Sequence, residues 1–308
     1  MSWFDKIVAA SLPLVPRPLV RRLSARYIAG EERADALTRG RELQDAGYRV
    51  TYDLLGEAVH DPATVDAAAD EYRALIDALI AGGLERNVSL KPTQMGLDLG
   101  EDQCFSVVDA LADFAHEKDA FLRFEMEDSP TVDGTLRVFE RLRERHAERI
   151  GCVLQSMLHR TPDDVRRLLE SDRRLNVRMV KGIYIEPEAI AWQHPDKVTE
   201  AFLECTRMLL DGGAYVGVAT HDERVVDGLC EYLTGNPQAR ERCEIQMLLG
   251  VREELRTTVR ARDLPVRVYV PYGEMWYPYV LRRLKGNPKL ARYAMLGLFR
   301  RREKLAQA

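Results

Sequence analysis

Apolar positions follow two alternating patterns from residue 48 onward. Short apolar runs, typical of strands buried on both faces, are each followed by a stretch in which apolar residues recur at helical spacing. The predicted strands cover residues 49–55, 87–90, 121–125, 150–154, 175–180, 214–219, 243–248 and 266–270. The predicted helices cover 101–117, 131–147, 196–211, 222–234 and 251–262, with further helices that start at Asp61-Pro62 and Thr161-Pro162. In both of these pairs the polar residue caps free amide groups and proline fits the first turn.

These patterns give about eight strand–helix units in about 235 residues, which is the usual size of a closed barrel of eight parallel strands. An open, doubly wound sheet is the competing fold, but a dinucleotide-binding sheet usually has a G-x-G-x-x-G turn after its first strand, and this chain has none. We therefore predict an α/β fold of the (β/α)8 TIM type. The predicted organisation is an N-terminal helical arm (1–47), the barrel (48–288) and a C-terminal basic helix (289–308).

The segment 269–284 predicts a strand, a turn and a helix. Pro271 and Gly273 are expected to break the strand. A helix that begins near Trp276 would bring Tyr279, Arg282 and Arg283 within one turn of each other. Two guanidinium groups beside a phenol suit the binding of a small carboxylate, because each guanidinium is a planar fork. An exposed basic helix near the chain end is the alternative.

Composition excludes several classes of protein and partner. Hydrophobic residues make up 46% of the chain and aromatic residues 7%, which fits a globular protein with a real core. A net charge of -4 argues against nucleic acid as a partner. Five scattered cysteines indicate a reducing compartment, and the six histidines form no zinc-binding pattern, so we expect no metal site. We expect a cytoplasmic protein, since no apolar stretch approaches the roughly 20 residues that span a bilayer.

Residues 1–30 mix apolar and basic positions, with two prolines in the apolar stretch. A signal peptide would be followed by a small-residue cleavage site, whereas here Arg17, Arg21 and Arg22 follow. Peripheral contact with the inner face of a membrane is one interpretation. An arm that packs on its own domain is the favoured one.

Polar residues lie at or just beyond nearly every predicted strand end. Active sites of such barrels lie at the carboxyl ends of the strands, so these residues are the candidates for a site. They are Asp53, Lys91, Glu125 with Glu127 and Asp128, Gln155, Arg178 with Lys181, Thr220 with His221, Glu244 with Gln246, and Tyr269.

Several of these candidates allow more than one chemistry. Lys91 suits a Schiff base, a cation near an anionic substrate, or an ordinary ion pair. Glu125 and Glu127 suit acid–base work or charge balance, of which charge balance is favoured. Arg178 and Lys181 suit a phosphate or a reduced flavin, and Gly182 permits close approach of a ligand. A strand-end turn with a solvated lysine is the plainer interpretation.

The chain also resembles the proline dehydrogenase family of flavin enzymes, over about residues 48–288. The resemblance depends on the joint order of short motifs, each of which is weak alone. The motifs lie at residues 52–57, 89–91, 125–128, 177–182, 219–222, 245–248 and 269–273, and at Tyr279 with 282–284.

The resemblance implies a distorted barrel that holds FAD and is capped by its last helix, and the oxidation of L-proline to a pyrroline carboxylate. It implies a quinone as electron acceptor and a downstream pyrroline-carboxylate dehydrogenase as a further partner. The implied catalytic residues are Lys91, Arg178 and Tyr279, and the implied substrate-binding residues are Lys91, Leu248, Tyr269, Tyr279, Arg282 and Arg283. The implied cofactor-binding residues are Glu125, Gln155, Arg178, Lys181, Gly182, Thr220, His221, Gln246 and Arg283.

Two positions depart from the family pattern. The family usually has Asp where this chain has Glu125, which puts the ion pair with Lys91 in doubt. It usually has Glu where this chain has Gly286, which bears on FAD binding. The same chemistry on 4-hydroxyproline, a Schiff-base lyase that uses Lys91, and a barrel without turnover are the alternatives. Tyr279 argues against 4-hydroxyproline as the substrate, because the tyrosine ring would crowd the additional hydroxyl group.

Overall fold

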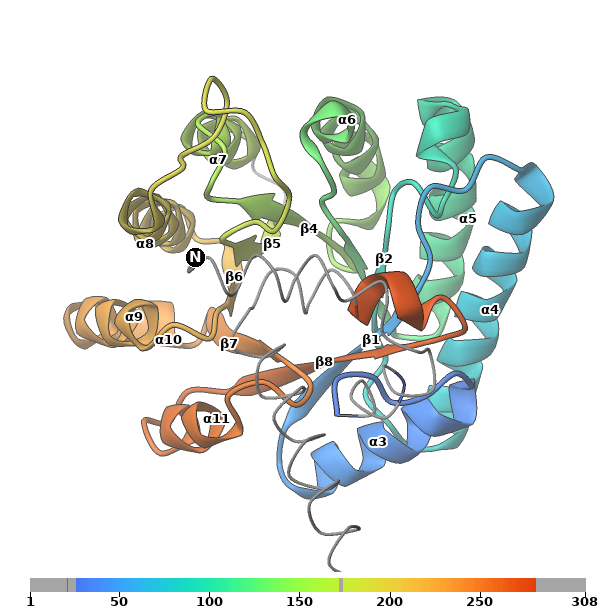
Figure 1. Ribbon diagram of the computed structural model, residues 1–308, viewed down its shortest axis with the longest axis horizontal. Coiled ribbons are helices and arrows are strands. Elements are labelled where there is room, and N and C mark those ends of the chain that lie inside the picture. The colour runs from blue at the N-terminus through green and yellow to red at the C-terminus, as the bar shows by residue number, and fades with distance from the viewer. Residues whose placement is uncertain (1–20, 22–25, 172–173, 281–308) are drawn as a thin grey trace, which may run out of the picture.

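The computed structural model describes residue 21 and the ranges 26–171 and 174–280. Eight parallel strands close into a barrel in the order β1 to β8, and helices surround it (Figure 1). The predicted (β/α)8 barrel is therefore confirmed. The strands are β1 (Arg49–Leu54), β2 (Asn87–Leu90), β3 (Phe121–Phe124), β4 (Ile150–Gln155), β5 (Asn176–Val180), β6 (Tyr215–Ala219), β7 (Cys243–Leu248) and β8 (Val266–Tyr272).

The predicted helices after residue 60 lie where their sequence pattern placed them, with small differences at their ends, whereas residues 33–45 were expected only as part of a helical arm. In the helix α4, Asp61 accepts a hydrogen bond from the Thr64 amide (3.0 Å) and Pro62 opens the first turn, as its sequence predicts. The helices are α3 (Arg33–Asp45), α4 (Pro62–Ala81), α5 (Glu101–Glu117), α6 (Ser129–His146), α7 (Thr161–Leu169), α8 (Pro195–Asp211), α9 (Glu223–Gly235), α10 (Pro237–Arg240) and α11 (Glu253–Arg260). The short 3-10 helix η2 (Leu97–Leu99) and α10 were not predicted.

β1 closes the barrel by pairing with β8 along its whole length, from Arg49 opposite Arg267 to Leu54 opposite Tyr272. Our expectation that Pro271 breaks β8 is wrong. Pro271 lies inside the strand, and its carbonyl accepts a hydrogen bond from the Ala29 amide (2.9 Å). The strand ends at Gly273 instead, where φ is +122°, a conformation that favours glycine.

α3 packs against β1 and β8 in the outer ring, between α11 and α4 (Figure 1). This is the place that a helix after β8 would occupy in a regular barrel of this type. The chain after β8 begins a helix at Trp276, as predicted, and this helix lies over the strands near β1 and β2 (Figure 1). The barrel is thus distorted, with a helix from before β1 on its outside.

Alternation along the strands separates an apolar outer layer from a polar interior. In β2, Val88 and Leu90 are fully buried beneath the helices, while Ser89 faces the barrel interior, where it contacts other polar side chains. Two glycines make room for large interior side chains. A Cβ at Gly151 would lie 2.4 Å from the Arg123 guanidinium, and one at Gly217 would lie 2.4 Å from the Gln246 amide.

Within these described ranges, no helix is long and apolar enough to cross a membrane. Most of the first 30 residues and the C-terminal helix expected at 289–308 lie outside the described residues. The domain boundaries stay predictions.

Candidate active site

The carboxyl ends of β1 and β2 bring Asp53 and Lys91 together. The Lys91 ammonium lies 3.2 and 3.3 Å from the two carboxylate oxygens of Asp53, and both side chains are almost completely buried. Burial alone would lower the pKa of Lys91, but the neighbouring carboxylates, led by Asp53, raise it. The ion pair with Asp53 favours the charged ammonium, whereas Schiff-base formation needs a neutral amine, so this pair argues against the lyase.

Arg178 is the centre of a second polar cluster inside the barrel. Its guanidinium donates hydrogen bonds to Gln246 on β7, to Glu125 after β3 and to Ser89 on β2, the last at 3.2 Å. It also stacks over the Tyr269 ring, with 5.1 Å between the guanidinium carbon and the ring centroid. Because four strands fix this one guanidinium, its position is set before any ligand binds.

Glu125 and Glu127 have separate partners, although both follow β3. Glu125 forms an ion pair with Arg178, while Glu127 accepts hydrogen bonds from the backbone amide and the hydroxyl of Thr93, at 2.9 and 2.8 Å. The doubt that Glu125 raised about the ion pair of Lys91 is thus answered by Asp53, which takes that partnership. The contact of Glu125 agrees with charge balance as its role, whereas Glu127 is held by neutral groups of Thr93.

Lys181 follows β5 and is partly exposed. Its ammonium contacts the Asp222 carboxylate (2.7 Å) and the Thr199 hydroxyl (2.8 Å). Burial alone would raise the pKa of Asp222, but hydrogen bonds from Arg224 and Lys181 outweigh it and lower the pKa to about 2. Gly182 has φ of +104°, so the chain turns there in a conformation that other residues rarely adopt.

The remaining predicted residues of β4, β6 and β7 lie along the same rim. The Gln155 amide donates to the Glu127 carbonyl (2.8 Å), and the Thr220 hydroxyl accepts from the Asp222 amide (3.0 Å). The Nε2 atom of His221 accepts a hydrogen bond from the Leu248 amide (3.0 Å). This contact ties the histidine ring to the end of β7.

Tyr279 lies over the rim of the barrel next to Lys91. It is buried, and it lines a small cavity together with Pro278, Met275, Lys91 and the chain segment 55–57. The helix that carries Tyr279 therefore caps the carboxyl ends of β1 and β2. Arg282, Arg283 and Gly286 lie outside the described residues, so their predicted roles stay predictions.

Taken around the barrel, the predicted residues fall into two adjoining groups. The predicted cofactor-binding residues come mainly from β4, β5, β6 and β7, which are neighbours in the sheet. The predicted substrate-binding residues come from β7, β8, β2 and the capping helix, with Asp53 on β1 between them.

One of the candidate residues lies at the other end of the barrel. Glu244 is the second residue of β7, at the amino end of the barrel, where it pairs with Arg267 and Arg49. We expected it at the carboxyl end because it precedes Gln246 by two residues, and a two-residue step keeps the face of a strand but moves by roughly 6–7 Å along it. Conversely, Ser89 contacts the Arg178 cluster although it is not among the predicted site residues. Its inward position between Val88 and Leu90 was the available signal.

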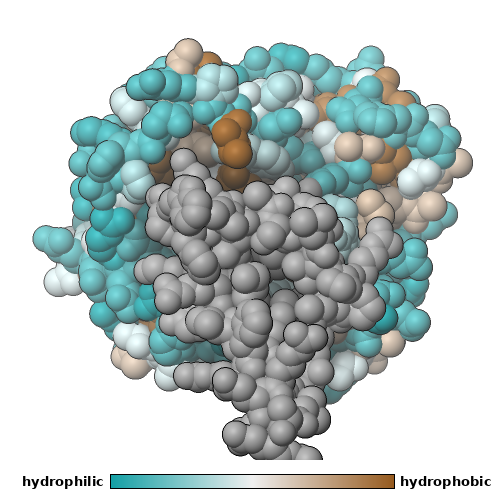
Figure 2. Space-filling view, viewed as in Figure 1, coloured by the Kyte–Doolittle hydropathy of each residue, from teal (hydrophilic) through white to brown (hydrophobic). Residues whose placement is uncertain are grey.

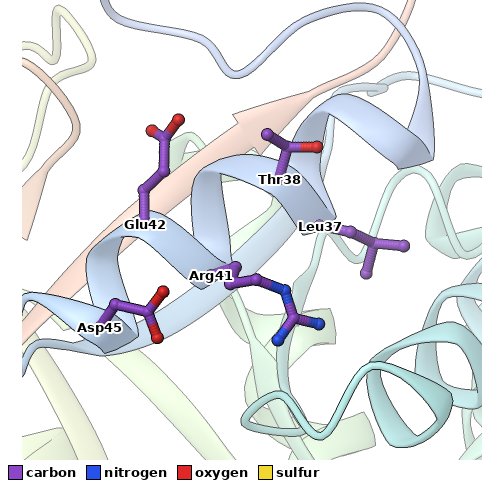
Figure 3. A pocket seen from close by; sticks show the side chains of 5 residues that line it. All are labelled: Leu37, Thr38, Arg41, Glu42 and Asp45. Carbon is purple, nitrogen blue, oxygen red and sulfur yellow. The ribbon is translucent and has the colours of Figure 1, made fainter.

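A separate hollow lies on α3, away from the strand ends. Figure 3 shows its lining, which comes from this one helix: Leu37, Thr38, Arg41, Glu42 and Asp45. Arg41 also reaches the Gly82 carbonyl (2.6 Å), so its charge is engaged by a neighbouring loop. The hollow gathers no residue predicted to bind substrate or cofactor.

Comparison with known proteins gives consistent findings. The family model described as proline dehydrogenase matches residues 36–292. The chain is 35% identical to a proline dehydrogenase of Deinococcus radiodurans over 303 residues, which cover 94% of this chain and 97% of the relative. It is 30% identical to proline dehydrogenase 1 of Bacillus subtilis over 281 residues, covering 91% and 92%.

A solved structure shares the fold. Proline utilization A from Bdellovibrio bacteriovorus, inactivated by N-propargylglycine, superimposes with a TM-score of 0.79 at 22% identity. The match covers 85% of this chain but only 32% of that protein, so this chain spans about a third of its length. At this identity the likeness shows the fold alone.

Proposed function

This chain belongs to the proline dehydrogenase family, and we propose that it oxidises L-proline to 1-pyrroline-5-carboxylate with FAD as cofactor and a quinone as electron acceptor. It is thus an oxidoreductase that acts on proline. The finer proposal rests on how two groups of polar residues share the rim at the carboxyl ends of the strands. Donors suited to a flavin dinucleotide gather on β4–β7, next to a buried Lys91–Asp53 pair and a capping tyrosine.

The chemistry of the donor set fits FAD. Lys181 supplies a partly exposed cation for a phosphate, Gln155 and Gln246 supply amides, and Thr220 supplies a hydroxyl. Arg178 supplies a buried cation that suits the negative charge of a reduced flavin. When bound, the cofactor accepts a hydride equivalent from carbon 5 of proline, and the protein contributes orientation and electrostatics.

On the substrate side, Lys91 holds a positive charge beside Asp53, and Tyr279 closes the cavity above them. We propose that Tyr279, Leu248 and Tyr269 hold the proline ring, while Arg282 and Arg283 bind its carboxylate. His221, whose Nε2 atom accepts a hydrogen bond from the Leu248 amide, is not needed as a base if the amine loses its proton on binding. L-proline is preferred over 4-hydroxyproline in this proposal, since the buried Tyr279 ring leaves little space for a hydroxyl.

We further propose a cytoplasmic enzyme whose product passes to a pyrroline-carboxylate dehydrogenase. Peripheral contact with the inner face of a membrane remains an alternative, which residues 1–30 would mediate.

The proposal is tested by removing the carboxylate clamp. We expect Arg282→Ala and Arg283→Ala each to raise the KM for L-proline by about 100-fold or more, because each loses a charged hydrogen-bonded contact worth about 2–5 kcal/mol. Steady-state kinetics with L-proline measure this, and bound FAD in Arg282→Ala, read from the visible spectrum, should match the wild type. The exposed Arg39→Ala variant is the matched control. An unchanged KM in both clamp variants would end the assignment.

A further inference from the structure

The loop between β5 and α8, residues 181–194, is the longest connection from a strand to the following helix among the described residues. It begins with Lys181 and Gly182, which we assign to the cofactor side of the site. Four large apolar side chains on it are exposed. Ile185 is fully exposed, Ile183 and Trp192 are 42% and 43% exposed, and Ile190 is 39% exposed.

These four account for most of the large exposed apolar side chains that the structure describes. The other two are Met275, near the capping helix, and Ile80, in the last turn of α4. Hydrophilic side chains predominate in the view of Figure 2, and apolar ones occur there only in small groups. Exposed apolar groups gathered on one face are typical of a binding surface. Five of the six lie in loops that follow strands, on the face that carries the site.

Hydrogen bonds and a ring contact hold this loop against the neighbouring segments of the barrel. Glu186 accepts hydrogen bonds from the amide and hydroxyl of Ser129 (2.8 and 2.6 Å), at the start of α6. The Trp192 amide donates to the Met157 carbonyl (2.8 Å), and the His159 amide donates to the Ile190 carbonyl (2.9 Å). The rings of His159 and Trp192 meet edge to face, 4.3 Å between centroids. A surface fixed in advance loses little conformational entropy when a ligand binds.

The charges of the loop favour an uncharged ligand. Lys181 is its only lysine or arginine, and this ammonium is paired with Asp222 (2.7 Å). The carboxylate of Glu186 is engaged by Ser129, and the remaining acidic residue, Glu188, would repel anionic lipid headgroups. An apolar molecule without net charge therefore matches this surface better than an anionic membrane does.

We propose that Ile183, Ile185 and Trp192 form the docking surface for the quinone that reoxidises the enzyme. This inference rests on the proposed function, because only a reduced cofactor at the adjoining rim supplies the electrons. The quinone takes two electrons and two protons and leaves as the hydroquinone, and the cofactor returns to its oxidised form. Lys181 and Gly182 connect this surface directly to the cofactor side of the site.

The test separates the two half-reactions. For Ile183→Ser and Ile185→Ser, we expect the KM for decylubiquinone to rise about tenfold, since burial of an isoleucine side chain has an effect of this order. The KM for ferricyanide, a small polar acceptor, and the rate of anaerobic reduction by L-proline should stay within about twofold of wild type. Ile80→Ser is the matched control, because Ile80 is 38% exposed on a helix away from the site.

A binding measurement independent of turnover accompanies the kinetics. Decylubiquinone should quench the fluorescence of Trp192 in the wild type, and a weaker titration is expected in Ile185→Ser. The Trp192→Phe variant identifies the contribution of that residue, since the chain has three tryptophans.

Several outcomes would overturn the proposal. An unchanged KM for decylubiquinone in both serine variants would do so, and so would an equal loss with ferricyanide. Loss of bound FAD in the variants would show that the apolar side chains contribute to cofactor binding and do not dock the quinone. Loss of cosedimentation with phosphatidylglycerol–phosphatidylethanolamine vesicles, at unchanged quinone kinetics, would assign them to a membrane. Failure of the proposed function is distinguishable, because then L-proline would not reduce even the wild type.

Discussion

The two ends of the barrel interior both hold buried charges but arrange them differently. At the amino end, Glu244 contacts Arg267 (2.6 Å) and Arg49 (3.0 Å), and Arg267 also contacts Glu85 (2.7 Å) and the Val50 carbonyl (2.7 Å). At the carboxyl end, Lys91 and Asp53 are 3.2 Å apart beside a cavity. Lys181 is partly exposed next to a long loop.

The pKa values also differ between the two ends: at the carboxyl end, burial outweighs the attraction of Lys91 and raises the pKa of Asp53. Burial alone would raise the pKa of Glu244, but Arg267, with Arg49 and Gln246, outweighs burial and lowers the pKa to about 2. The amino-end charges are thus neutralised by one another within a closed network. The carboxyl-end cations lie beside a cavity and a loop, where an anionic substrate or cofactor can approach. We infer that the amino end mainly stabilises the fold and the carboxyl end mainly serves the reaction.

Removing the Glu244 carboxylate, which is central to the amino-end network, should have the largest effect. We expect Glu244→Ala to lower the free energy of unfolding by about 3–5 kcal/mol, because it leaves the buried Arg267 guanidinium without its main partner. Urea unfolding measures the change. The control Glu42→Ala, which removes an exposed ion pair with Arg39, should cost less than about 1 kcal/mol. Equal effects of the two variants would refute a special role of the amino end.

The matching change at the carboxyl end should affect the reaction. We expect Arg178→Lys to slow the reduction of bound flavin by L-proline about 100-fold, about 3 kcal/mol, because an ammonium cannot reproduce the contacts of a planar guanidinium. Stopped-flow absorbance under anaerobic conditions measures the rate. A rate equal to that of the wild type would show that the Arg178 cluster is only structural.

The stability of the amino-end network should depend on pH through the pKa of Glu244. Its folded pKa of about 2 lies below its ordinary value of 4.5, so its stabilisation is present above pH 4.5 and is lost as pH falls toward 2. Between pH 6 and pH 3 the wild type should lose about 2 kcal/mol more stability than Glu244→Gln. Urea midpoints of both proteins at the two pH values test this. Parallel losses would contradict the assigned pKa.

The fold was largely predictable from sequence because strand burial and helix capping are local signals. β2 and β7 have the predicted bounds, and Asp61 caps α4 as its spacing implied. The placement of α3 between β1 and β8 was not predictable, since periodicity shows that a helix is amphipathic but not which strands it covers. Pro271 inside β8 was missed because its acceptability depends on register: β7 pairs with β8 only as far as Tyr269, so no neighbouring strand needs the amide that Pro271 lacks.

The site was predictable as a set of strand-end residues but not as a set of pairs. Alternation indicates that Asp53, Lys91, Glu125 and Arg178 face inward, yet the choice of partner depends on barrel register. Lys91 meets Asp53 because β1 and β2 are neighbours, whereas only the closed barrel brings Arg178 to both Glu125 and Gln246. The same register moves Glu244 to the opposite end.

The smallest expected effect concerns a contact outside the barrel interior. Ser129→Ala removes the hydrogen bond from the Ser129 hydroxyl to Glu186 but keeps the one from the backbone amide of residue 129. We therefore expect the protein to lose about 1 kcal/mol of stability. Thermal unfolding followed by circular dichroism measures it. Ser106→Ala, at an exposed hydroxyl that bonds within α5, is the control and should have less effect. A loss as large as that of Glu244→Ala would place a main stabilising contact on the carboxyl face.

The most direct test of the central claim is the visible spectrum of the purified protein during anaerobic addition of L-proline. If the carboxyl end of the barrel holds a flavin beside the proline site, the protein is yellow, loses its colour when L-proline is added and regains it with a quinone. A protein that stays colourless with added FAD, or a yellow protein that L-proline does not bleach, would contradict the claim.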